Sequence, residues 1–213
     1  RDWSSDVCSS DLHDGLRYSF DMLGEGARSA EDSARYLRDY EQAIDKIGAH
    51  QKAHNFPRPS GISVKLSALH PRYEMAQHDR VLKDMVPRVL GLCQKAAPFG
   101  MPITIDAEEG DRLQLSLEIA AAVMERLSGE WSGLGFAVQA YDKRAPAVIE
   151  FLADLARHTN RRIHVRLVKG AYWDTEIKRG QERGWPDYSV YTRKNNTDIA
   201  YHACAKRSEE HTS

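Results

Sequence analysis

The sequence predicts an α/β fold, a partial TIM-like (β/α)8 barrel with about five of the eight strand–helix units. Short apolar runs rich in β-branched residues alternate with helical patterns, and the strands start roughly thirty to forty residues apart. This alternation is typical of right-handed parallel βαβ units. Polar residues recur near the strand ends, as they do in barrels. No Gly-x-Gly-x-x-Gly follows a predicted strand, which disfavours the open dinucleotide-binding sheet that five units would also fit.

The first unit starts with a strand over 18–23, where aromatic residues alternate with small or polar ones before a Gly-Glu-Gly turn. Ser29 and Asp32 then resemble a capping box, with Asp in place of Glu, and mark the start of a helix. Apolar residues follow at helical spacing, and Gly48 is the expected end of that helix. The second strand is predicted over 61–66.

The next two units follow the same pattern. A helical stripe runs from Val81 to Cys93 and is broken at 98–100 by Pro and Gly. The strand that follows covers 103–108 and ends in acidic residues. Apolar residues over 113–127 then predict another amphipathic helix.

The last elements lead into the most polar strand end. A strand over 135–141 precedes a helix over 148–156, and the fifth strand covers 164–168. A short, charged helix is predicted over 175–184, and a final helix over 197–206.

Composition excludes several classes of function. The 213 residues are 41% hydrophobic and 29% charged, typical of a soluble globular protein of one large α/β domain. A net charge of −1 gives no basic surface for nucleic acid. Because no run of about 18 apolar residues exists, we expect no membrane span. Three scattered cysteines (Cys8, Cys93 and Cys204) indicate a reducing, cytoplasmic compartment, and neither they nor the nine dispersed histidines predict a metal site.

The two ends differ from the rest of the chain. Residues 1–12 show neither periodicity nor a signal-peptide pattern, and 207–213 cut across a helical pattern. Both resemble translated adapter sequence, so we expect neither to be native and take 14–206 as the domain. The same residues in an intact genomic copy of the gene would contradict this.

Three strand-end residues are candidates for chemistry. Lys65 lies in an apolar strand, where an unpaired ammonium is costly, so it must meet a polar lumen or an anion. An ion pair with Asp106 and a ligand-binding role both remain open. Gln139 needs hydrogen-bond partners, from either a core network or a ligand.

Other polar residues near strand ends have simpler interpretations. Glu108 and Glu109 are expected on the rim or as caps of the next helix, where negative charge suits the N-terminus. His70 and Arg72 are expected in a solvated loop.

The end of the fifth strand combines cations, a glycine and aromatic rings. Arg166 and Lys169 stand three residues apart, so a regular strand places them on opposite faces, although Gly170 lets the backbone turn. The guanidinium of Arg166 suits a carboxylate, a phosphate or a heterocycle edge. Tyr172 and Trp173 could stack on a planar ligand, but a core position is the preferred interpretation.

Four segments in order are similar to the proline dehydrogenase domain of the bacterial proline utilization A flavoproteins. They are 63–73, 106–109, 138–141 and 166–173, and the segments 18–25 and 192–194 fit as well. The resemblance covers about 14–206, and several motifs in one order are far more specific than any single motif.

The resemblance implies a distorted eight-stranded barrel that holds FAD without a covalent bond. It implies oxidation of L-proline to Δ1-pyrroline-5-carboxylate by hydride transfer to the flavin N5, with electrons passed to a membrane quinone. It also implies a protein that is fused to an aldehyde dehydrogenase domain and is peripherally attached to the inner membrane. No nucleic acid is expected as a partner of this part.

The resemblance also implies roles for residues that match the motifs. Lys65 would be a cation on the substrate side, Asp106 would lie beside it and the flavin, and both would be catalytic together with Arg166. Gln139 and Arg166 would contact the isoalloxazine edge, and Tyr172 would pack near the substrate. The other residues implied at the cofactor are Val168, Lys169, Gly170, Ala171, Trp173, Thr192, Arg193, Lys194 and Thr197.

Two departures from the family pattern stand out. Asn195 and Asn196 replace a less polar residue followed by His or Tyr. The last three strands and final helix of the family, with an arginine pair and a second tyrosine for the substrate, are not found after Lys206. We therefore expect this chain to be a fragment that is inactive and poorly stable by itself. The alternatives are a Schiff-base lyase using Lys65 or Lys169, or a non-catalytic fragment.

Overall fold

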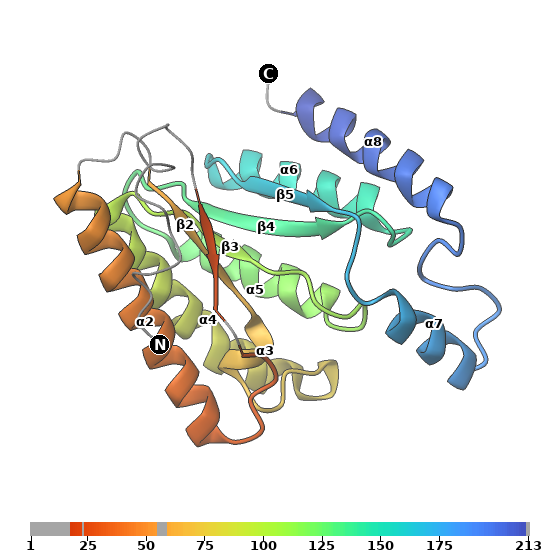
Figure 1. Cartoon of the computed structure of the whole chain (residues 1–213), viewed down its shortest axis with the longest axis horizontal. Coiled ribbons are helices and arrows are strands. Elements are labelled where there is room, and N and C mark those ends of the chain that lie inside the picture. Colours follow the sequence, from red (N-terminus) through yellow and green to blue (C-terminus); the bar gives the residue numbers. More distant parts are fainter. Residues whose placement is uncertain (1–17, 23, 55–58, 212–213) are drawn as a thin grey trace.

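The computed structural model describes residues 18–22, 24–54 and 59–211 (Figure 1). Five parallel strands form one sheet in sequential order. They are β1 (Ser19–Asp21), β2 (Gly61–Val64), β3 (Ile103–Ile105), β4 (Leu134–Gln139) and β5 (His164–Val168). Because crossovers between parallel strands are right-handed, strands in sequential order have all their connections on the same side of the sheet, which is how a (β/α)8 barrel is built. The predicted fold class is confirmed.

Helices follow the strands in a row along one side of the sheet. The long ones are α2 (Ala30–Ala53), α4 (His78–Ala96), α5 (Leu113–Arg126), α6 (Ala145–Thr159) and α8 (Lys194–Glu210). Each packs against the next along the chain, and α8 also contacts β5. Among the described residues, no helix is both long and apolar enough to cross a membrane.

Shorter helices sit at the ends of strands β2 and β5 and beside α4. They are α3 (Leu66–Leu69), α7 (Trp173–Glu182) and two 3₁₀ turns, Met75–Gln77 and Ala97–Phe99. In Figure 1, α7 lies beyond the ends of β4 and β5, apart from the row of long helices.

The two faces of the sheet differ in chemistry. Ile62, Ile103 and Phe136 are almost completely buried and belong to the core shared with the helices. The alternate residues of β2, β3 and β4, which point to the other face, are small or polar. Ser63 and Thr104 lie side by side in register, and Ser63 also hydrogen-bonds across the face to Arg166. The concave face is therefore a polar lumen, as Lys65 requires.

Several predicted boundaries are confirmed and others shift. Ser29 caps α2, because its Oγ accepts a hydrogen bond from Asp32 N at 3.0 Å. Gly48 does not end α2, which continues to Ala53. A Cβ at Gly48 would lie 2.4 Å from the Phe99 ring, so this glycine makes room for packing.

Two further boundaries differ from prediction. β2 ends at Val64, so Lys65 stands just after the strand, at the start of α3, rather than within it. The last helix begins at Lys194 and extends to Glu210. Segment 1–12 with Cys8, residue 23 of the predicted first strand and residues 212–213 lie outside the described residues.

Candidate active site

A cluster of four charged side chains lies on the concave face at the carboxyl ends of the strands. Lys65 Nζ lies 3.1 Å from Asp21 Oδ1 and 3.3 Å from Asp106 Oδ2. The other carboxylate oxygen of Asp106 pairs with Arg166 Nη2. The Asp106 side chain is only 7% exposed, so its charge depends on these two cations. The structure thus confirms the ion pair between Lys65 and Asp106 and adds Arg166 to it.

Lys65 keeps its proton in this setting. Burial disfavours the ammonium, but the hydrogen bond to Asp21 and the charges of Asp106 and Asp21 outweigh burial and raise the pKa of Lys65. Tyr40 supports the same residue, since its hydroxyl accepts a hydrogen bond from Lys65 N at 3.1 Å. The cluster therefore presents a fixed cation to the lumen.

Arg166 reaches across the sheet from β5 toward β2. Its Nη1 donates to Ser63 Oγ at 2.7 Å, and Ala137, its neighbour in register on β4, is small enough to leave room for the long side chain. The buried Nε of Arg166 has no hydrogen-bond partner within the described part of the chain. Arg166 also lines a hollow of about 440 Å³ toward the amino-terminal half of this face. A buried donor left unpaired is a site for an acceptor.

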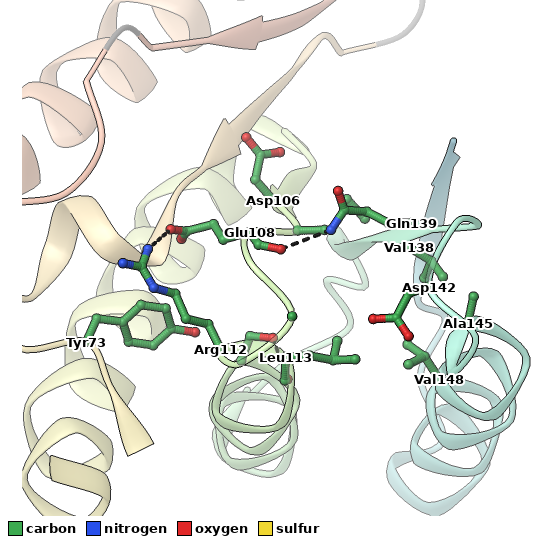
Figure 2. Close-up of a pocket in the computed structure, with 14 residues that line it drawn as sticks. Tyr73, Asp106, Glu108, Arg112, Leu113, Val138, Gln139, Asp142, Ala145 and Val148 are labelled. Atoms are coloured by element: carbon green, nitrogen blue, oxygen red, sulfur yellow. Dashed lines mark hydrogen bonds and ion pairs between the residues drawn. The ribbon is translucent and has the colours of Figure 1, made fainter. Parts of the chain in front are cut away.

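Gln139 connects two strand-end loops. Its Nε2 donates to the Glu108 carbonyl at 2.9 Å (Figure 2), and its Oε1 accepts from Ala171 N at 3.0 Å. The sequence predicts that Gln139 bonds either to a core network or to a ligand, and the structure shows the network. This network holds the loop after β3 against the loop after β5.

Glu108 is neither on the rim nor a cap of the next helix, in contrast to the prediction. It is 8% exposed, and its carboxylate accepts from Ser67 N at 2.9 Å and pairs with Arg112 Nη1 at 2.6 Å. Burial raises the pKa of Glu108 in spite of these partners. Glu108 therefore caps α3, a helix of the neighbouring unit, which sequence spacing could not reveal. Glu109 is partly exposed and pairs with Arg112 at 3.1 Å.

The loops around Glu108 enclose a small cavity, shown in Figure 2, that is lined by Tyr73, Gln139 and Asp142 among others. Its volume of about 20 Å³ is that of a single water molecule. The cavity lies beneath the strand-end loops and is too small for an organic substrate, so the concave face is the candidate site.

The segment after β5 lies partly in solvent. Trp173 is 41% exposed, and its Nε1 donates to the Tyr191 carbonyl at 2.9 Å, so the core interpretation of Trp173 is wrong. Tyr172 is partly buried, which raises its pKa to about 12, with Glu25 adding to the effect. Gly170 has φ +133° and packs against the Tyr141 ring.

Lys169 and the start of α8 form a separate group. Lys169 and Lys194 both pair with Asp198, Lys169 on Oδ1 and Lys194 at 3.1 Å. Lys169 thus points to α8 whereas Arg166 points to the lumen, as their spacing predicted. Thr192, Arg193, Asn195 and Asn196 are exposed, and Thr197 is buried. The structure does not bring this group into contact with the Lys65 cluster.

Histidine placement corrects a further prediction. His70 is 3% exposed, its Nδ1 accepts from Arg72 N at 3.0 Å and its Nε2 lies 3.4 Å from Asp84. Arg72 is exposed as predicted. His50 in the last turn of α2 and His54 at its C-cap stand four residues apart, a spacing that sequence reasoning overlooked, but the described ranges contain no group of three possible metal ligands.

Sequence reasoning also missed Asp21, the second anion on Lys65. Its signal was available, since a carboxylate inside a predicted strand requires a partner as much as a lysine does. Residues on or directly after β1, β2, β3 and β5 thus converge on one face, which is the arrangement of a barrel active site.

The family model of proline dehydrogenase matches residues 7–212, nearly the whole chain. The chain belongs to the proline dehydrogenase family. The bifunctional PutA proteins of Klebsiella aerogenes and Rhizobium meliloti are 50% and 51% identical to it, over 91% and 88% of the chain. Proline dehydrogenase 1 of Bacillus subtilis subsp. natto is 27% identical over 90%.

Solved structures of this family share the fold. A crystal structure of a mutant proline utilization A of Bradyrhizobium japonicum is 54% identical, covers 92% of the chain and superposes with a TM-score of 0.86. The crystal structure of proline utilization A from Bdellovibrio bacteriovorus, inactivated by N-propargylglycine, is 25% identical, covers 95% of the chain and has a TM-score of 0.87. The chain spans 15% of the length of the PutA relatives and 52% of the Bacillus enzyme.

Proposed function

We propose that the full-length protein containing this chain oxidises L-proline to Δ1-pyrroline-5-carboxylate with FAD as hydride acceptor. The observation that carries this proposal is the Lys65–Asp106–Arg166 cluster on the lumen side of a proline dehydrogenase fold. The names of the relatives, proline dehydrogenase and bifunctional PutA, support the same substrate and reaction.

Lys65 binds the substrate in this proposal. Its ammonium is fixed by Asp21 and Asp106 at 3.1 and 3.3 Å, so an incoming carboxylate meets a cation already held in position. Holding the carboxylate orients the proline ring, and orientation of this kind supplies a large part of an enzyme's rate enhancement. Tyr172, partly buried beyond β5, provides an aromatic wall for the ring.

The residues on the concave face fit a flavin. Arg166 has a buried Nε without a partner, and such a donor suits the acceptor-rich edge of an isoalloxazine. Gln139 and the peptide of Ala171 border the same side. FAD, when bound, supplies the hydride acceptor at N5. Val168, Gly170, Trp173, Thr192, Arg193 and Thr197 are proposed to line the cofactor with Lys169 and Lys194.

A Schiff-base mechanism is less well supported. It requires a neutral amine, whereas Lys65 is paired with two carboxylates that raise its pKa, and Lys169 is paired with Asp198. Lys65 is therefore held as a cation, and the amine of Lys169 is occupied by its ion pair with Asp198. This favours electrostatic binding of a substrate over attack on a carbonyl.

The electron acceptor and the wider assembly are further parts of the proposal. We take a membrane quinone as acceptor, with peripheral attachment to the inner membrane. The word bifunctional in the names of the PutA relatives supports a second activity on the same polypeptide, for which we propose an aldehyde dehydrogenase domain.

Product analysis tests the proposed reaction. The purified full-length protein is incubated with L-proline and with pyrrolidine, which has the ring but no carboxylate, and the cyclic imine is trapped with ortho-aminobenzaldehyde. We expect the adduct from L-proline and little from pyrrolidine, because pyrrolidine has no carboxylate for Lys65 to bind. Equal product from both amines, or none from L-proline, contradicts the proposal.

A further inference from the structure

A buried glutamate on α7 is unexplained by the proposed site. Glu176 is 2% exposed, although it lies in the first turn of the short, charged helix beyond the strand ends (Figure 1). Buried carboxylates are found where they have specific partners. Glu176 has partners outside α7 as well as on it. Its role therefore goes beyond stabilising the N-terminus of that helix.

Glu176 binds the loop that follows β3. Its Oε1 accepts a hydrogen bond from Gly110 N at 2.7 Å, and its Oε2 accepts from Ser189 Oγ at 3.3 Å. Arg179, one turn along α7, lies 3.4 Å from Glu176 and 3.1 Å from Asp111. Two contacts thus join α7 to residues 110 and 111.

Gly110 is held from both sides. While its N–H binds Glu176, its carbonyl accepts from Arg144 Nη2 at 3.0 Å. A Cβ on Gly110 would lie 2.8 Å from Arg144 Nη2 and 3.1 Å from Glu176 Oε2. The absence of a side chain at residue 110 is what allows the two charged groups to close on this peptide.

The same two segments are joined a second time by Gln139. That side chain links the Glu108 carbonyl to Ala171 N, and Glu176 links Gly110 to α7. The loop that starts at Asp106 and the segment that carries Tyr172 are therefore fixed to each other at two points, one on each side of Tyr172. With a single link, the loop and the segment could rotate about it, whereas two links fix their orientation.

We propose that Glu176 is a positioning residue that fixes the spacing between Asp106 and Tyr172 across the site. It acts through Gly110 and touches neither the substrate nor the cofactor. The proposal deepens the proposed function, on which its kinetic part rests, and it assigns α7 the task of holding the aromatic wall over the charged cluster.

The test uses the full-length protein and the variants Glu176→Ala and Glu176→Gln, with Glu182→Ala as the matched control. Glu182 is an exposed glutamate of the same helix that pairs with Lys178 at 3.8 Å. For Glu176→Ala we expect KM for L-proline to rise about tenfold, as for losses of residues that orient a site indirectly. Glu176→Gln keeps an acceptor for Gly110 N and should stay within about threefold of wild type. Glu182→Ala should match wild type.

Hydrogen–deuterium exchange gives a readout that does not depend on turnover. In Glu176→Ala, amides of 107–112 and 170–173 should exchange faster than in wild type, and those of α2 should not change. Gly110→Ala, which pushes the two partners apart while leaving Glu176 in place, should accelerate the same amides. If Glu176→Ala does not fold, the proposal is tested by the amide exchange of Gly110→Ala and the KM of Glu176→Gln.

The outcomes separate the two proposals. A wild-type protein that does not oxidise L-proline overturns the proposed function, while exchange at 107–112 and 170–173 still tests the link between the segments. If wild type is active and Glu176→Ala changes neither exchange nor KM, or lowers thermal stability without changing either of them, the role of Glu176 is overturned.

Discussion

Lys65 Nζ lies 3.3 Å from Asp106 Oδ2 across the carboxyl ends of β2 and β3. Neither charge is stable alone at this depth, because the Lys65 and Asp106 side chains are only 17% and 7% exposed. The pair explains how a cation can stand at the end of an apolar strand without being neutralised. It also fixes that cation where a substrate carboxylate can reach it.

Asp106→Asn should damage both stability and activity. The amide keeps the shape but leaves Arg166 and Lys65 with one anion fewer, so we expect a loss of about 3 kcal/mol in the free energy of unfolding. We also expect kcat/KM for L-proline to fall by about tenfold or more. Denaturant unfolding and steady-state kinetics measure these effects. Asp187→Asn, which alters an exposed pair with Lys143, is the control and should change neither.

Arg166→Lys should not be a conservative change. One ammonium cannot reach Ser63 and Asp106 as the two Nη atoms do, and it offers no Nε donor. We expect the variant to lose bound flavin on gel filtration and to raise KM for L-proline by about tenfold or more. Arg157→Lys, at an exposed pair with Asp154, serves as the control. Full retention of flavin and of KM would exclude Arg166 from the site.

Gly170→Ala should disrupt the turn after β5. An added Cβ would lie 1.5 Å from the Tyr141 ring, and the φ of +133° is already unfavourable for other residues. We expect a loss of about 3 kcal/mol or more in the free energy of unfolding. Gly184→Ala, at φ +61° with open space around it, should cost only about 1 kcal/mol. Equal losses for the two variants would contradict this account of Gly170.

Stability should fall in mild acid because of His70. Burial lowers its pKa, and the nearby charges of Arg88 and Arg80 add to this, although Asp84 opposes it. The unfolded chain takes up a proton as pH falls below about 6.5, whereas the folded protein does not, so stability present above that pH is lost below it. His70→Asn keeps an acceptor for Arg72 N and removes the titration. Denaturation midpoints at about pH 7.5 and about pH 5.5 should therefore differ less in the variant. A larger difference in the variant would contradict the assignment.

The main elements of the fold could be predicted from local pattern. Alternating apolar runs located all five strands, and Ser29 with Asp32 located the start of α2. The end of α2 could not be found this way, because Gly48 is explained by the ring of Phe99, some fifty residues later in the chain. Contacts between distant residues leave no periodic signal.

The candidate site shows the same division. Lys65, Asp106 and Arg166 could be selected because a charge at the end of an apolar strand requires a partner. Sequence patterns could not select the buried residues His70, Glu108 and Glu176. These residues lie in loops or on a charged helix, where polar residues are ordinarily solvated. Their burial follows from docking of one strand–helix unit on another. The exposed Trp173 is the converse case, since an aromatic residue beside a strand ordinarily enters the core.

Binding of the substrate carboxylate by Lys65 is measured by anaerobic titration of the full-length protein with L-proline, in which the visible absorbance of the bound flavin is monitored. We expect L-proline to bleach this band in wild type. Lys65→Met, with the same flavin content, should need about a hundredfold more L-proline for half-bleaching, because the carboxylate has lost its cation. A wild-type flavin that L-proline does not bleach would show that L-proline is not the reductant. A Lys65→Met variant with an unchanged dependence on L-proline would contradict the binding of the carboxylate by Lys65.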